Sequence, residues 1–86
     1  MATKYVVDRG GKIIGRYREG ITTLYYDLNG RQIARTQQSG RILVLIDQQS
    51  GRQIGRFDGS FTVDGSGRMV GRGKLFHFIV YPTAKR

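Results

Sequence analysis

Short apolar segments alternate with polar, glycine-containing segments along the whole chain. Runs rich in Val, Ile, Leu, Tyr and Phe are separated by segments that contain Asp, Asn, Ser and Gly. Short β-branched and aromatic runs between turn residues are typical of strands joined by tight turns. Thirteen glycines against one proline agree with this pattern. The sequence therefore predicts an all-β protein.

One pattern recurs four times and divides the chain into similar units. It reads Asp, turn residues, Gly, a basic residue, any residue, Ile or Val, Gly or Ala, then Arg. The copies are DRGGKIIGR (8–16), DLNGRQIAR (27–35), DQQSGRQIGR (47–56) and DGSGRMVGR (64–72). Self-similarity at a short period indicates a repeat architecture. We expect one domain over 1–86, with repeats at about 4–18, 22–37, 41–58 and 60–74.

Each copy contains the signature of a tight turn. Asp three residues before Gly predicts a type I turn that is closed by a left-handed glycine. Each copy then forms one β-hairpin, with one extra loop residue in the third copy. The basic residue after Gly lies opposite Asp, so we expect the cross-strand ion pairs Asp8–Lys12, Asp27–Arg31 and Asp64–Arg68. Such pairing would give the carboxylates a structural role and not a catalytic one.

The residues one and three before each Asp are apolar in every copy, and this periodicity of two predicts a buried face. The predicted core residues are Tyr5, Val7, Leu24, Tyr26, Val44, Ile46, Phe61 and Val63. The small residues Gly15, Ala34, Gly55 and Gly71 are expected opposite the outer members of these pairs. A single hairpin cannot bury such a face alone. We therefore predict four hairpins arranged with pseudo-fourfold symmetry as a small barrel or flower.

The most apolar segment lies outside the repeats, at residues 75–81. It predicts a C-terminal closing strand that covers an edge or one end of the barrel, and the alternative is an interface for self-association. The single histidine, His77, lies in this segment and is predicted to be a packing residue. A zinc site would need further His or Cys ligands, and the chain has neither. The sequence predicts no metal and no other cofactor.

The repeats of the form D-x-x-G-[KR]-x-[IV]-[GA]-R resemble those of the 4-fold β-flower domain family. These are small bacterial proteins with four hairpin petals about a pseudo-fourfold axis. The resemblance covers residues 4–74, although similar Asp-Gly-Arg elements also occur in unrelated hairpin repeats. Ala34 in the second copy and the longer loop of the third depart from the pattern. The resemblance implies a fold, but no particular activity and no catalytic residue.

Fifteen Lys and Arg residues against six acidic residues give a net charge of +9. Such an excess favours anionic partners, although basic residues also keep β-rich proteins soluble and discourage edge pairing. The last residue of each copy has no evident structural role: Arg16, Arg35, Arg56 and Arg72. These arginines are the candidate site for phosphate, a nucleic-acid backbone or an acidic partner. Alternatively, each lies flat over apolar neighbours with its charged group in water.

No catalytic motif is present, since the sequence lacks both a nucleophile elbow and a phosphate-binding loop in a strand-to-helix context. The first interpretation is therefore a non-enzymatic structural or interaction module that is able to self-associate. The second is a basic β-barrel that binds nucleic acid or another polyanion through the repeat arginines. No apolar run approaches the ~20 residues of a membrane span, and the beginning of the chain lacks the apolar region of a signal peptide. We therefore expect a soluble, cytoplasmic protein without a membrane partner.

Overall fold

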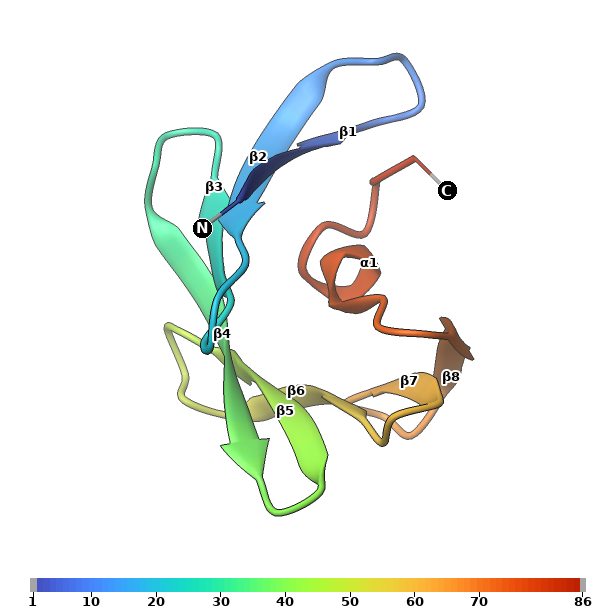
Figure 1. Ribbon diagram of the computed structural model, residues 1–86. Coiled ribbons are helices and arrows are strands. Elements are labelled where there is room, and N and C mark those ends of the chain that lie inside the picture. The colour runs from blue at the N-terminus through green and yellow to red at the C-terminus, as the bar shows by residue number, and fades with distance from the viewer. Residues whose placement is uncertain (1, 86) are drawn as a thin grey trace.

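The computed structural model describes residues 2–85, which form one antiparallel sheet and one short helix. The strands are β1 (Thr3–Val7), β2 (Ile13–Arg18), β3 (Leu24–Asp27), β4 (Gln32–Ser39), β5 (Ile42–Asp47), β6 (Gln53–Phe57), β7 (Phe61–Asp64) and β8 (Met69–Arg72). Their order in the sheet is their order in the chain. The sheet curls into a half-barrel that stays open between β1 and β8 (Figure 1). The prediction of an all-β protein is confirmed.

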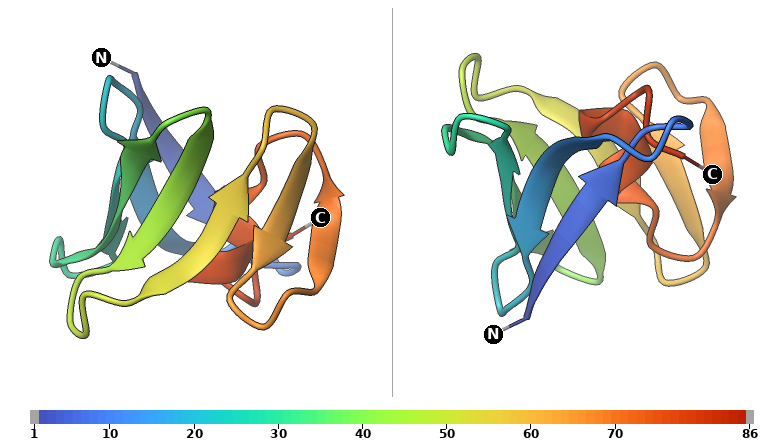
Figure 2. Two further views of the ribbon diagram at one scale, coloured as in Figure 1. Left: turned by 90° about the horizontal axis from the view of Figure 1, so that it is seen from below. Right: turned by 90° about the horizontal axis from the view of Figure 1, so that it is seen from above.

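The predicted closing strand at 75–81 is wrong, because this segment forms the helix α1 (Phe76–Val80). The helix lies inside the curl (Figure 1), and Figure 2 shows the same arrangement from two further sides. An apolar run without alternation does not distinguish a buried helix from a buried strand. Here the helix fills the concave side, and Phe76 is 1% exposed. A strand at the edge of the sheet would leave that space empty.

The chain after α1 returns to the first turn. Ala84 forms an isolated antiparallel bridge with Asp8, and the Lys85 backbone N–H donates to the Val7 carbonyl at 2.8 Å. These two contacts attach the C-terminal segment to the end of β1. The segment is thus held at the β1 side of the opening without pairing along the length of the strand.

The predicted turns at the four Asp-to-Gly segments are confirmed. Each segment joins two adjacent antiparallel strands. The glycines have positive φ angles, which are 81° at Gly11, 85° at Gly30, 72° at Gly51 and 91° at Gly67. Glycine adopts this region without the steric cost that a Cβ atom brings.

The predicted ion pairs across the turns are wrong, although the basic residue does lie opposite Asp in the backbone ladder. Asp27 Oδ1 accepts the backbone N–H groups of Asn29 and Arg31, both at 2.9 Å. Asp8 and Asp64 accept from their own turns in the same way. Over residues 2–85 the one ion pair joins Lys4 Nζ to Glu19 Oε1 at 3.0 Å. Fixed turn amides lie closer to the carboxylate than a long, solvated side chain, whose ordering costs entropy.

The predicted core face is also wrong, because the inward residue in each copy lies two positions before Asp. Val6 is 5% exposed, Tyr25 2%, Leu45 0% and Thr62 0%. Tyr5 is 65% exposed, and of the other predicted core residues (Val7, Leu24, Tyr26, Val44, Ile46, Phe61 and Val63) only Val44 is buried.

A β-bulge accompanies this reversal in each pair of strands that a repeat turn connects. The register shifts between Val6 and Val7, Tyr25 and Tyr26, Leu45 and Ile46, and Thr62 and Val63. The extra residues are Ile14, Ile33, Ile54 and Val70. A shift by one residue sends every following side chain to the other face. The small residues consequently lie opposite the inward residues, as Gly15 does opposite Val6.

The small residues leave room for the C-terminal segment. A Cβ atom at Gly15 would collide with the Tyr81 ring, and one at Gly55 would lie 2.7 Å from Ile79 Cδ1. Tyr81 Oη lies 2.6 Å from the Tyr26 carbonyl and 2.8 Å from the Arg16 carbonyl, so its hydroxyl donates between them. The missing side chains thus permit the close packing that holds the helical segment against the sheet.

Candidate interaction surface on the convex face

The four repeat arginines lie on the convex face of the sheet. Each follows an inward-facing small residue, as Arg16 follows the buried Gly15, and adjacent residues of a strand point to opposite faces. Their strands β2, β4, β6 and β8 are distributed around the curl (Figure 1). The arginines therefore point outward from different sides of the half-barrel and do not converge on one site. Anion binding through them stays a prediction.

Three of these arginines contact their neighbours on the same face. The Arg16 guanidinium carbon lies 5.5 Å from the centre of the Tyr26 ring. That of Arg72 lies 5.7 Å from the centre of the Phe61 ring. Arg35 Nη1 donates to Gln48 Oε1 at 3.2 Å.

Arg56 differs from the other three repeat arginines. Its side chain is exposed, and within residues 2–85 the guanidinium makes no hydrogen bond, ion pair or ring contact, although the Arg56 backbone pairs in the sheet. The backbone N–H groups of Phe61 and Ser60 lower the pKa of Asp58, and the positive charge of Arg56 adds a smaller effect in the same direction. Arg56 is therefore the repeat arginine whose charged group is held least by the protein.

The turn carboxylates accept hydrogen bonds from their own turns, and these bonds lower the pKa values of Asp47 and Asp64. The Ser66 hydroxyl, followed by the Arg68 N–H, lowers the pKa of Asp64. The hydroxyl and N–H of Ser50 lower the pKa of Asp47 in the same way. A hydrogen bond to the charged form favours that form. These groups stay ionised at neutral pH, so general acid chemistry by them is disfavoured.

His77 of α1 packs against aromatic rings of β2 and of its own helix. Its ring stacks on Tyr17 at a centroid distance of 6.0 Å and lies 4.1 Å from the Phe78 ring. Burial lowers its pKa, and the charge of Lys4 adds to this effect. These contacts agree with the predicted packing role.

Within residues 2–85, no three His, Cys, Asp or Glu side chains come together in a way that could hold a metal ion. No helix in the same range is both long and apolar enough to cross a membrane.

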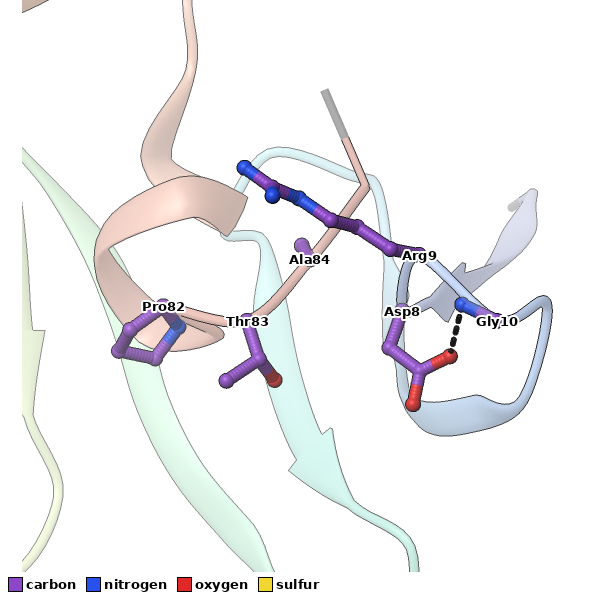
Figure 3. Close-up of a pocket in the computed structure, with 6 residues that line it drawn as sticks. All are labelled: Asp8, Arg9, Gly10, Pro82, Thr83 and Ala84. Atoms are coloured by element: carbon purple, nitrogen blue, oxygen red, sulfur yellow. Dashed lines mark hydrogen bonds between the residues drawn. The ribbon is translucent and has the colours of Figure 1, made fainter.

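A cleft of about 420 Å³ lies between the first turn and the C-terminal segment (Figure 3). It is lined by Asp8, Arg9, Gly10, Pro82, Thr83 and Ala84. The Asp8 carboxylate accepts the Gly10 N–H at 2.9 Å, and the exposed Arg9 side chain extends toward the C-terminal segment. The carboxylate is therefore already used by the turn, and Arg9 is the one charged group left to meet a ligand.

Two further depressions lie where one strand pair meets the turn of the next. The first, of about 240 Å³, lies beside the turn that follows β3 and is lined by Tyr5, Ile13, Gly15, Arg16, Asp27 and Leu28. The second, of about 450 Å³, lies one repeat further on and is lined by Asp27, Arg31, Gln32, Ile33, Asp47, Gln48 and Gln49. We call them the first and second junctions. The first is mainly apolar, whereas polar and apolar surface line the second in similar amounts.

The sequence interpretation missed the apolar first junction. The available signal was the residue that follows the basic position of the repeat, which is Ile13, Gln32, Gln53 or Met69. An apolar residue at this position is equally compatible with a buried strand. In the structure Ile13 is 46% exposed and Leu28 is 58% exposed, so this difference between the copies lies on the surface.

Comparison of this chain with protein-family models, with curated proteins and with solved structures returns no match. The resemblance to 4-fold β-flower domains therefore stays a hypothesis that is supported by the repeat motif alone.

Proposed function

We propose that this protein is a non-enzymatic interaction module that binds a macromolecular partner through its convex face. The observation that carries the proposal is a contrast between residues with contacts inside the fold and large apolar residues that are left exposed. The turn carboxylates and His77 are used within the fold, whereas Tyr5 and Leu28 are 65% and 58% exposed beside Arg16. Large exposed apolar groups beside a guanidinium are typical of interaction surfaces.

The scaffold of this module is proposed to be four hairpin repeats around a pseudo-fourfold axis. Three features support this arrangement. The turns share a positive-φ glycine, the register shifts at the same place in each strand pair, and the repeat arginine follows the inward small residue in every copy. A repeated scaffold allows each copy to vary its outer residues while the inner ones keep the fold.

Site-specific photo-crosslinking tests the proposed function. A benzoylphenylalanine residue replaces Leu28 on the convex face or, as a matched exposed control, Ser39 at the end of β4. We expect a discrete crosslinked species in extracts of the source cells from position 28 and none from position 39. A species with the mass of two chains would identify the partner as a second copy. No crosslink from position 28, or from Tyr5 and Gln53 in further variants, would contradict the proposal.

Polyanion binding is the second candidate function, and the scarcity of ion pairs favours it. Against 15 Lys and Arg residues in the chain, the described residues contain the single Lys4–Glu19 pair. Unpaired guanidinium groups bind phosphates and release the counterions of a nucleic acid. The convex face would then bind the phosphate backbone without reading the bases.

Fluorescence anisotropy with a labelled single-stranded oligonucleotide tests this second function. For four phosphate contacts, binding to a single strand should weaken roughly 50-fold between about 50 and 200 mM salt. Replacing Arg16, Arg35, Arg56 and Arg72 with Gln should reduce the affinity more than replacing Arg9, Arg31, Arg41 and Arg68, which removes the same charge. Equal losses in the two quadruple variants, or a shallow salt dependence, would contradict a specific role for the repeat arginines.

A further inference from the structure

The first and second junctions occupy corresponding places in consecutive repeats but differ in chemistry. Ile13 and Gln32 follow the basic residue of their copies, and Leu28 and Gln48 follow the Asp of the next copies. At the second junction, Gln32 Nε2 donates to Gln48 Oε1 at 2.8 Å, and Arg35 binds the same oxygen. The side-chain amides of Gln32 and Gln48 are therefore paired with each other, although the second junction is the larger depression, at about 450 Å³ against about 240 Å³.

At the first junction the corresponding residues leave an open apolar surface. Ile13 and Leu28 replace the two glutamines, and neither side chain can form the hydrogen bond that joins Gln32 to Gln48. Tyr5 adds a ring that is 65% exposed. Because Gln32 and Gln48 occupy the corresponding positions one copy later, the fold accommodates polar residues there and does not require apolar ones. Exposed apolar side chains grouped at one depression mark an interaction site.

The charges around the first junction favour an acidic partner. Arg16 lines the depression. Two exposed basic residues lie beside its lining residues. Lys12 precedes Ile13 in the chain, and the Arg31 carbonyl accepts the Asp27 N–H at 2.9 Å. Asp27 is the one acidic residue that lines the depression, and the N–H groups of Asn29 and Arg31 already bind its Oδ1. A second copy of this chain carries a net charge of +9 and would be repelled.

The size of the first junction fits one anchoring side chain. Its volume of about 240 Å³ lies below the ~300–1,000 Å³ of small-molecule pockets. The Arg16 guanidinium stacks on Tyr26, which holds it in place at the rim. One apolar residue flanked by carboxylates would match both the depression and its charged surroundings.

From these observations we infer that the first junction is a docking site for an acidic protein segment that inserts one aromatic side chain between Tyr5, Ile13 and Leu28. The inference rests on the proposed interaction function and names its site and partner chemistry. Arg16 binds a carboxylate of the segment, and the second junction, where Gln32 donates to Gln48, does not take part.

Titration of the ¹⁵N-labelled protein with two synthetic peptides tests this inference. The probes are acetyl-EEDWEDE-amide and the same peptide with Trp replaced by Ala. We expect amide shifts confined to residues around Tyr5, Ile13, Arg16 and Leu28, with the Trp peptide binding about tenfold more tightly. The variant Ile13→Gln with Leu28→Gln should lose about the same factor, whereas Met69→Gln, which removes another exposed apolar side chain, should not change the affinity.

A transplant keeps the test informative if the double Gln variant does not fold. Gln32→Ile with Gln48→Leu should create a second set of Trp-dependent shifts at the second junction. Equal binding of the two peptides, or shifts spread over all strands, would overturn the inference. So would sedimentation that shows Ile13→Gln with Leu28→Gln dissociating a dimer, or a single-stranded oligonucleotide that binds this junction more tightly than the Trp peptide.

The peptide and crosslinking results separate this inference from the proposed function. A crosslink from Leu28 to a cellular partner without localised peptide binding would keep the interaction module and remove the acidic aromatic ligand. Localised peptide binding without any cellular crosslink would keep the site and contradict the module's proposed role.

Discussion

The concave and convex faces of the sheet come from the same eight strands but are constrained in different ways. On the concave face, each inward residue lies opposite a small residue, and the C-terminal segment fills the remaining space. On the convex face, corresponding positions range from Ile13 to Gln32. Close packing tolerates few changes, whereas an exposed position tolerates many. The difference teaches that the repeats are held alike by their interior and can acquire separate roles outside.

The largest expected effect comes from removing a concave side chain. Leu45 is 0% exposed, so Leu45→Ala should lower the free energy of unfolding by about 3 kcal/mol through lost burial and a cavity. Ile21→Ala, at a residue that is fully exposed, should change it by less than about 0.5 kcal/mol. Urea unfolding of both variants checks the contrast. Similar losses in the two variants would mean that the concave face is not the core.

A smaller loss is expected when a side chain is added to the concave face. Gly15→Ala places a Cβ against the Tyr81 ring and 2.8 Å from the Tyr26 carbonyl oxygen. The backbone cannot retreat easily, so we expect about 2 kcal/mol of destabilisation. Gly10→Ala is the control, because its Cβ would lie 3.4 Å from Asp8 Oδ1 and meet nothing closer. Thermal unfolding should separate the two variants, and an unchanged midpoint for Gly15→Ala would refute the close packing.

The strands and turns of this fold were predictable from the sequence, but the faces of the strands were not. The Asp and Gly residues determine the turns through local backbone geometry, so their positions alone identify them. The core face depends on whether Ile14 and its counterparts join the ladder or bulge out of it. A bulge has no distinctive residue type at these positions, and one unpaired residue reverses the assignment for all that follow.

The C-terminal helix and the first junction were unpredictable for a different reason. The segment at Phe76–Val80 is helical because it fills a space that the curled sheet creates, and that space exists only after the sheet has formed. Ile13 and Leu28 are far apart in sequence and line one depression only through the contact of two repeats. Both features depend on tertiary contacts, and local sequence patterns do not report such contacts.

A moderate loss of stability is expected when the C-terminal segment loses its hydrogen bonds to the sheet. Tyr81→Phe removes the hydroxyl that binds the carbonyls of Arg16 and Tyr26, and should lower the free energy of unfolding by about 1 kcal/mol at neutral pH. Tyr5→Phe, at a ring that is 65% exposed, should change little. Urea unfolding of the two variants at neutral pH measures the difference.

The same hydroxyl predicts a loss of stability at alkaline pH. Burial raises the pKa of Tyr81 to about 12 in the folded protein, whereas an unfolded tyrosine has a pKa of about 10. The raised pKa means that the neutral form is favoured in the fold, so its contribution is complete below about pH 10 and is lost as the pH rises through 12. Tyr81→Phe should flatten this decline, and an equally steep decline in the variant would argue against the assignment.

The smallest expected effect concerns two arginines that occupy the same repeat position on the convex face. The Arg16 guanidinium lies over the Tyr26 ring at 5.5 Å, whereas the Arg56 side chain is exposed and makes no hydrogen bond, ion pair or ring contact in the described part of the chain. Arg16→Gln should therefore cost about 0.5 kcal/mol, and Arg56→Gln should be close to neutral. A double-mutant cycle of Arg16→Gln with Tyr26→Leu isolates the ring contact, and a coupling energy of zero would show that the geometry adds no stability. If Arg56→Gln nevertheless weakens partner binding more than Arg16→Gln does, the arginine that the fold holds least is the one most available to a partner.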